Sequence, residues 1–256
     1  MLALVSPAKK LDFNEMAAPI SHSQPDFLDR SAVLIKQAKK LSRADLSRLM
    51  KLSDKLTELN FERFKTYSPP FTKSNAKQAA LAFNGDTYVG LDAPSLSEDD
   101  LVYAQDHLRI LSGLYGMLRP LDLIQPYRLE MGSRLKNPKG ADLYDFWGDD
   151  LADAIDHIAA THKESVVINL ASNEYFKAAR PKTMQTRVIM PVFKEVKGGV
   201  AKVLGLFAKR ARGSMARYII TNRIEKSEKL KKFNEGGYAY QADLSGDDTW
   251  VFTRQR

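Results

Sequence analysis

The segment from Leu101 to Leu135 constrains the fold most, because it predicts two helices joined by a turn that requires glycine. Ser97 and Asp100 have the spacing of a capping box, and apolar residues recur on one helical face after them. This helix runs into the sequence SGLYG at 112–116, in which two glycines flank an apolar pair. Arg119-Pro120 follows, and proline suits the first turn of a new helix. The pattern predicts a helix-hairpin-helix-like element.

This predicted element has the features of a phosphate-binding site. Backbone N–H groups at the start of its second helix could bind phosphate whatever the base sequence. Gly113 and Gly116 would let a phosphate approach the backbone closely. Four arginines surround the turn: Arg109, Arg119, Arg128 and Arg134. A tight corner between two helices inside a core fits the same spacing, so that interpretation stays open.

Positive charge is concentrated in one part of the sequence. The chain has a formal net charge of +8 and a pI of about 9.4, and the segment 194–232 contains 12 Lys or Arg against 3 Asp or Glu. The whole excess of charge therefore lies in that segment. Within it, a helix is predicted from 208 to about 224, with an apolar stripe on one side. Its basic residues on the other faces are Lys209, Arg210, Arg212 and Arg217. Such a patch indicates a polyanionic partner, although a solvated helix face would carry similar charges.

Polar residues follow two buried strands, which are predicted at 1–5 and 166–170. The second is an unalternating apolar run, typical of the centre of a sheet. If the two strands are parallel neighbours, the residues after them share a crevice at the carboxyl edge, where α/β sheets commonly bind ligands. These residues are Ser6, Lys9, Lys10, Ser172, Asn173 and Glu174, with Lys177 nearby. The crevice could hold a small ligand or floor a nucleic-acid groove, but caps and turns also use such residues.

The remaining elements are interpreted as scaffold. Three helices are expected between 26 and 66, and nothing in them suggests chemistry. Residues 79–91 are predicted to form a β-hairpin around Asn84-Gly85, and 190–207 a second one around Gly198-Gly199. Residues 135–141 are expected to form an exposed basic loop. No Pro- or Gly-rich linker divides the chain, so we expect a single domain over 1–256.

Composition excludes several functions. The chain has no cysteine, which rules out disulfides, thiolate metal sites and thiol peroxidase chemistry. The four histidines are scattered without metal-ligand spacing, so no metal or other cofactor is expected. The apolar stretch before Ser6 is too short for a secretory signal, and no run reaches membrane-spanning length. We therefore expect a cytoplasmic protein without a membrane partner.

Several motifs together resemble one known family. They are SPAK at 6–9, LSGLYG at 111–116, RPLD at 119–122, QPYRLEMG at 125–132, FWGD at 146–149 and NLAS at 169–172. The set closely resembles the YaaA family of bacterial proteins linked to peroxide-stress resistance, over nearly the whole chain. The resemblance implies a single compact α/β (mixed α+β) fold with a central mixed sheet surrounded by helices. It also implies a basic cleft, a helix-hairpin-helix-like element, DNA binding and a role in limiting iron-driven oxidative damage.

The leading hypothesis is a non-enzymatic protein that binds double-stranded DNA largely without sequence specificity. A monomer is favoured, but the oligomeric state stays open. Whether plain, bent or damaged duplex is preferred stays open. The expected DNA-binding residues are Lys9, Lys10, Arg109, Gly113, Gly116, Arg119, Arg128, Lys177, Lys209, Arg210, Arg212 and Arg217. The alternative is an enzyme acting on a nucleotide or damaged nucleic acid, with Glu174 as general acid or base beside Lys9. A third hypothesis is a regulatory protein whose basic face meets acidic proteins.

Overall fold

A mixed eight-stranded β-sheet forms the centre of the molecule in the computed structural model, which describes residues 1–14 and 21–255. The strand order is β4-β3-β1-β6-β7-β10-β9, with β8 paired to β7. The strands from β3 to β10 in this order run parallel, whereas β4, β8 and β9 pair antiparallel. The bounds are β1 (Leu2–Val5), β3 (Leu108–Ser112), β4 (Gly116–Leu118), β6 (Val166–Leu170), β7 (Arg187–Lys197), β8 (Val200–Lys202), β9 (Ala239–Tyr240) and β10 (Thr249–Gln255). The expected mixed α/β fold is confirmed.

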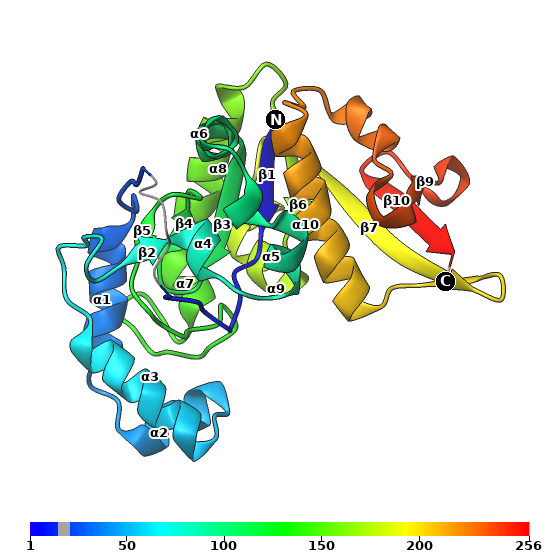
Figure 1. Ribbon diagram of the computed structural model, residues 1–256. Coiled ribbons are helices and arrows are strands. Elements are labelled where there is room, and N and C mark those ends of the chain that lie inside the picture. The colour runs from blue at the N-terminus through cyan, green and yellow to red at the C-terminus, as the bar shows by residue number, and fades with distance from the viewer. Residues whose placement is uncertain (15–20, 256) are drawn as a thin grey trace.

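Helices surround this sheet (Figure 1). They are α1 (Leu28–Ala38), α2 (Arg43–Met50), α3 (Asp54–Thr66), α4 (Ala79–Ala82), α5 (Asp86–Leu91), α6 (Glu98–His107), α7 (Leu143–Trp147), α8 (Asp150–Ala160), α9 (Asn173–Phe176) and α10 (Gly205–Thr221). Short 3₁₀ helices are η1 (Ala93–Ser95), η2 (Lys177–Ala179), η3 (Ser227–Lys232), η4 (Glu235–Gly237) and η5 (Ala242–Leu244), and β2 (Lys77–Gln78) pairs with β5 (Leu123–Ile124). Among the described residues, no helix is both long and apolar enough to cross a membrane.

Strands β1 and β6 are buried neighbours at the centre of the sheet. All their residues are at most 5% exposed, as their continuous apolar sequences predict. They pair in parallel from Leu2↔Val167 to Val5↔Leu170. Their carboxyl ends therefore meet at one edge of the sheet, and in Figure 1 the arrow of β1 points toward the side from which helices α2 and α3 project. The two predicted strands are confirmed, and they are parallel neighbours, which was the condition for a shared crevice.

Helices α2 and α3 form an arm that projects from the body beside α1 (Figure 1). Ser42 begins α2 with a capping box, in which its side chain and that of Asp45 each accept from the other residue's backbone. Lys51 ends the helix in a left-handed conformation, with φ of 51°. The chain turns within Lys51-Leu52-Ser53 and enters α3. The arm is thus an αα-hairpin with a short connection.

The prediction of a helix-hairpin-helix-like element at 101–122 is wrong. Helix α6 ends at His107, and the next residues form β3, which pairs with β1 and continues through a turn into β4. The sequence LRILS at 108–112 fits a buried strand or a helix, and pairing with β1 decides between them. A Cβ on Gly113 would lie 2.3 Å from the Leu129 carbonyl oxygen, and Gly116 has φ of +69° against Trp147. Both glycines serve internal packing rather than an exposed phosphate site.

Residues 79–91 form helices α4 and α5 rather than the predicted hairpin, and α5 packs directly on α10. A Cβ on Gly90 would lie 2.0 Å from the Arg210 carbonyl oxygen. A Cβ on Gly213 would lie 1.8 Å from the Thr87 carbonyl oxygen. The two helix backbones are therefore in contact, which only glycine allows at these positions. By contrast, a hairpin exists around Gly198-Gly199 as β7 and β8, but its second strand ends at Lys202, and α10 begins at Gly205, inside the predicted range 190–207.

This contact generates a stability prediction. Gly213→Ala should lower the free energy of unfolding by about 1–3 kcal/mol or more, because the added carbon overlaps the backbone of α5. Gly205→Ala, in the first turn of the same helix, is the matched control, since a Cβ there would have no neighbour within 4 Å. We expect that control to be neutral or slightly more stable. Chemical denaturation of both variants provides the measurement, and equal stabilities would contradict the close contact of the two helices.

Candidate functional site

A cavity of about 470 Å³ lies at the carboxyl ends of β1 and β6. Strand ends, α5, α9, α10 and the segment 127–130 form its walls. Its lining residues are Ser6, Pro7, Ala8, Lys9, Lys10, Asn84, Gly85, Asp86, Thr87, Tyr88, Tyr127, Arg128, Leu129, Glu130, Leu170, Ser172, Glu174, Tyr175, Lys209 and Arg212. The shared crevice expected from the two strands therefore exists. Asn173 and Lys177 are not among its lining residues.

Hydrogen bonds tie the two strand ends together beneath this cavity. The Ser172 backbone N–H donates to Ser6 Oγ at 2.8 Å, and Ser6 Oγ lies 3.3 Å from Ser172 Oγ. The Tyr88 hydroxyl donates to the Ser6 carbonyl oxygen at 3.1 Å and so fixes α5 to the same point. These serines are engaged with each other, and the structure uses them to build the floor of the site.

The carboxylates of the lining are occupied by partners inside the protein. Glu130 Oε1 lies 3.2 Å from Lys9 Nζ and 3.1 Å from the Arg128 guanidinium. Glu174 Oε1 accepts from the Gly132 backbone N–H at 3.0 Å. The Asp86 carboxylate makes a longer ion pair, with its Oδ1 3.5 Å from Arg210 Nε. Five cationic side chains line the cavity against three carboxylates, so the cavity is positively charged overall.

Arg212 differs from the other cations of the lining. It projects from α10, is partly buried, and makes no hydrogen bond or ion pair with any described residue. Burial lowers the pKa of its guanidinium below the usual value. Lys10 and Lys209, which are exposed, also lack ion-pair partners within the described part of the chain. A partly buried cation without a counter-charge favours the binding of an anion.

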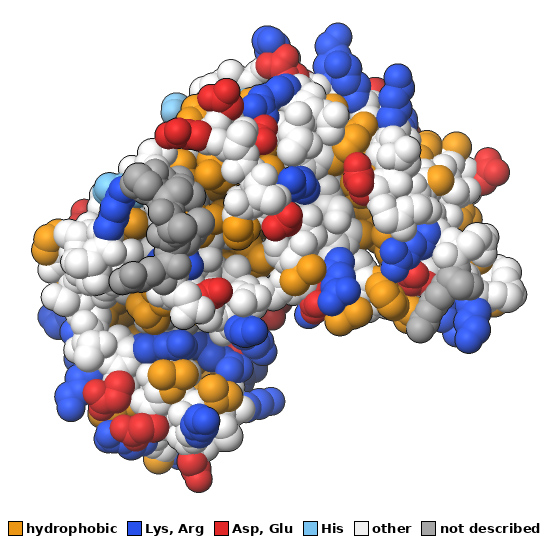
Figure 2. Space-filling view, viewed as in Figure 1, with side chains coloured by type: hydrophobic (Ala, Val, Ile, Leu, Met, Phe, Trp, Pro, Cys, Tyr) orange, Lys and Arg blue, Asp and Glu red, His pale blue; other side chains and the backbone are white. Residues whose placement is uncertain are grey.

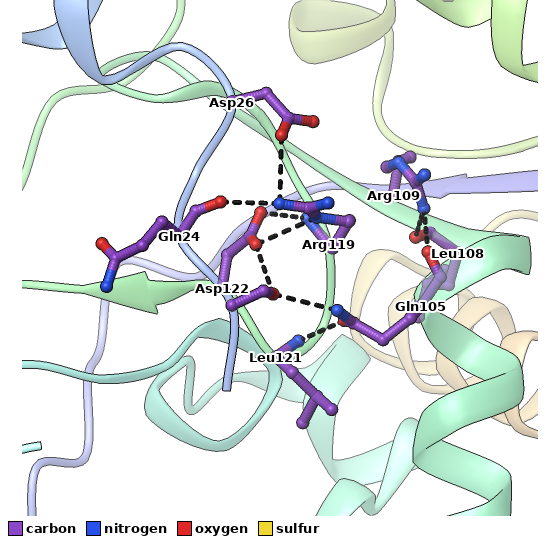
Figure 3. Close-up of polar contacts among 9 residues, drawn as sticks. Gln24, Asp26, Gln105, Leu108, Arg109, Arg119, Leu121 and Asp122 are labelled. Atoms are coloured by element: carbon purple, nitrogen blue, oxygen red, sulfur yellow. Dashed lines mark hydrogen bonds and ion pairs between the residues drawn. The ribbon is translucent and has the colours of Figure 1, made fainter. Parts of the chain in front are cut away.

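Two of the arginines expected to hold DNA are structural in this fold (Figure 3). Arg109 is 7% exposed and donates to the carbonyl oxygens of Gln105 and Leu108. Arg119 donates to Asp122 at 3.1 Å and to the Gln24 carbonyl oxygen at 2.6 Å, and pairs with Asp26. The Arg109 guanidinium binds carbonyl oxygens of α6 and β3, and the Arg119 guanidinium joins Asp122 to the loop at 24–26, so contact with phosphate is not supported for either.

Other expected cations are divided between structural contacts and the surface. Arg217 donates to the carbonyl oxygens of Leu91 and Asp92, at 3.1 and 2.9 Å, and so ties α10 to the end of α5. Lys177 lies over the Tyr144 ring, 4.5 Å from its centroid. The basic helix is therefore not one uniform face: Lys209 and Arg212 line the cavity, whereas Arg217 holds the helix in place.

A second basic groove was missed by the sequence analysis. It is lined by Gln37, Lys40, Leu41, Asp45, Arg48, Leu49, Arg134, Leu135, Lys136, Asn137 and Pro138, and its volume is about 680 Å³. We call it the arm groove, because α1, α2 and the 134–138 loop form it. Asp45 is the carboxylate of this lining, and it pairs with Arg48 at 2.5 Å. The helices were interpreted as scaffold, and the cations of the groove come from three separate stretches of sequence, at 40, 48 and 134–136, so no single run of charge indicated it.

A further basic side chain, on α3, lies near the lining of the cavity. Burial and then repulsion from Arg128 lower the pKa of Arg63, a residue of α3, so the two guanidinium groups lie near each other. Figure 2 shows Lys and Arg side chains gathered where the arm meets the body, beside a concave outline of the molecule. The arm groove, Arg63 and the cavity thus form candidate positions for several anionic groups.

The histidines do not form a metal site within the described residues. His107 and His162 pack edge to face with ring centroids 4.7 Å apart, and His107 stacks on Tyr103. Glu164, which the sequence places near His162, accepts instead from the Ser227 backbone and hydroxyl. Burial lowers the pKa of His162 to about 4, and positive charges around it, including Arg109, act in the same direction.

This pair generates a pH prediction. His162 has a pKa of about 4 in the fold and about 6.5 when unfolded, so between these values the unfolded chain binds more protons. Its contribution to stability should therefore be lost as pH falls from 6.5 toward 4. The variant His162→Phe keeps a ring at this position but cannot titrate. Denaturation at several pH values should show the variant gaining stability relative to wild type as pH falls from 6.5 toward 4. A difference in the free energy of unfolding that stays constant with pH would contradict the assignment.

Comparison with known proteins finds one family model and many similar proteins that cover nearly all of this chain. A family model described as peroxide stress protein YaaA matches residues 1–244. The UPF0246 proteins of Ralstonia nicotianae and Ralstonia pickettii are each 54% identical over 255 residues, covering 100% of this chain and 99% of the relative. The UPF0246 protein of Cupriavidus metallidurans is 54% identical over 258 residues with the same coverage.

Proposed function

Because this chain belongs to the peroxide stress protein YaaA family, we propose that it binds DNA and limits iron-driven oxidative damage during hydrogen peroxide stress. The binding would be carried by phosphate contacts and so would be largely independent of base sequence. The proposal combines the family with the distribution of cations that have no partner among the described residues.

The observation that carries the proposal is the arm groove. Arg134 and Lys136 are exposed and make no ion pair with any described residue. Lys40 contacts the Gln37 side-chain oxygen, at 3.4 Å. These cations converge from the turn after α1 and from a separate loop on one concavity, whose carboxylate Asp45 already pairs with Arg48. Such a basic concavity suits a phosphate backbone.

In this proposal the α2–α3 arm contributes to phosphate binding, the role that was expected of residues 101–122. The arm is an αα-hairpin on the surface, whereas β3 and β4 within 101–122 form a buried β-hairpin. Duplex DNA would lie in the concave region between arm and body, where Figure 2 shows clustered Lys and Arg. Arg63 of α3 and Arg128 of the cavity would lie along the same path. Lys9, Lys10 and Lys209 at the cavity would extend it.

The arm groove provides the test. The triple variant Lys40→Ala, Arg134→Ala and Lys136→Ala should weaken binding of a random-sequence duplex by about 10- to 100-fold at moderate salt. The slope of log K against log salt should fall by up to about three, since each lost phosphate contact removes about 0.9. Fluorescence anisotropy over a range of salt concentrations measures both quantities.

A matched control removes the same charge elsewhere. Lys226, Lys229 and Lys232 are exposed or partly exposed, lie in or beside η3 and make no ion pair with a described residue. Replacing all three by Ala should change affinity by less than the groove variant. An equal loss would show that net charge, rather than the arm groove, determines binding. Cells carrying the groove variant should also survive hydrogen peroxide less well than cells carrying the control.

A further inference from the structure

We propose that the cavity at the carboxyl ends of β1 and β6 holds one unpaired nucleotide, whose phosphate is bound by Arg212. The inference rests on the proposed DNA binding, and it assigns a distinct ligand to a different part of the molecule from the arm groove. Charge, the state of the neighbouring carboxylates and the size of the cavity all support it.

The first argument is the unbalanced charge of Arg212. Its guanidinium is partly buried and has no partner among the described residues, and burial alone accounts for its lowered pKa. The neighbouring arginines of the same helix differ, since Arg210 approaches Asp86 and Arg217 donates to two carbonyl oxygens. Keeping a cation away from water without a counter-charge costs free energy, and an entering anion would offset that cost.

The second argument is that the carboxylates of the cavity do not neutralise Arg212. Glu130 Oε1 forms ion pairs with Lys9 and Arg128, and Glu174 Oε1 accepts a hydrogen bond from the Gly132 backbone N–H. Lys10 and Lys209 add exposed positive charge to the same lining. The guanidinium fork of Arg212 suits two oxygens of one phosphate group.

The third argument is the size and character of the walls. A volume of about 470 Å³ is within the range of small-ligand sites, and it is far too small to admit a duplex. Apolar and aromatic residues, Pro7, Leu129, Leu170 and Tyr175, share the lining with the cations and offer contact to a base.

Two sources could supply this ligand. One is a free nucleoside monophosphate, and the other is an unpaired nucleotide at the end of a DNA strand. Both present a phosphate next to an unstacked base, and an enzyme or binding protein can take up an unstacked nucleotide without admitting the duplex. The probes must therefore include free and DNA-borne nucleotides.

The experiment uses the full-length chain and four probes: deoxyadenosine 5′-monophosphate, deoxyadenosine, inorganic phosphate and a blunt duplex. A fifth probe is the same duplex with one phosphorylated nucleotide overhanging each 5′ end. Wild type should bind the monophosphate at least about 10-fold more tightly than deoxyadenosine or inorganic phosphate. Arg212→Gln should reduce monophosphate binding by about 10- to 100-fold, and Arg212→Lys should retain an intermediate affinity.

The variants separate this inference from the proposed function. Arg212→Gln should leave blunt-duplex affinity within about threefold of wild type, whereas the arm-groove triple variant should lose it and keep monophosphate binding. Melting temperatures establish that every variant is folded; removing an unpaired, partly buried charge should not destabilise the protein.

The outcomes are decisive in both directions. Monophosphate binding that depends on Arg212 supports a free nucleotide as ligand, and an Arg212-dependent preference for the overhanging duplex supports the strand end. Equal binding of the monophosphate by wild type and Arg212→Gln would overturn the inference. So would inorganic phosphate or deoxyadenosine binding as tightly as the monophosphate, or the absence of both monophosphate binding and overhang preference. In each of these cases salt-dependent binding of the blunt duplex would leave the proposed function standing.

Discussion

The parallel pairing of β1 with β6 is the interaction on which the rest of the structure depends. The two strands are buried along their whole length, so their backbone groups must be satisfied by neighbouring strands. Their parallel direction brings Ser6 and Ser172 together at one edge, where a hydrogen bond from the Ser172 backbone joins them. Tyr88 then attaches α5 to the same edge, and α10 packs on α5 through glycine. The walls of the cavity follow from this chain of contacts.

Net charge alone does not locate a binding surface in this protein. Arg109 and Arg119 are basic residues next to a glycine-rich turn, yet both donate to oxygens inside the fold. Arg217 belongs to the most basic segment and holds α10 against α5. The cations available to an external anion are those that lack such partners among the described residues, and Arg212 and Arg134 are examples. Because pairing depends on residues far apart in the sequence, it becomes visible only in the tertiary structure.

The glycines likewise show that the sequence indicates a special position but does not identify the atoms that contact it. Gly113 and Gly116 were expected to admit a phosphate, but the atoms that approach them belong to Leu129 and Trp147. At Gly90 and Gly213 the approaching atoms belong to the partner helix, and neither position carried a signal in the sequence. A glycine indicates that something comes close or that the backbone is unusual. What comes close is decided by packing.

The mixed α/β class was expected from the resemblance to a known family. The sequence by itself determined the central strands at 1–5 and 166–170, the capping box of Ser97 and Asp100, and the polar residues that gather at the strand ends. These features depend on local composition and on periodicity, which act over a few residues. Only the tertiary structure decided that 108–112 is a strand, that the α2–α3 arm borders a basic groove, and which arginines are free. A five-residue stretch with three apolar residues is compatible with either secondary structure, and its pairing with β1, about a hundred residues earlier in the chain, selects the strand. The same is true of charge, because the tertiary structure decides whether a guanidinium has a partner inside the protein or is left without one.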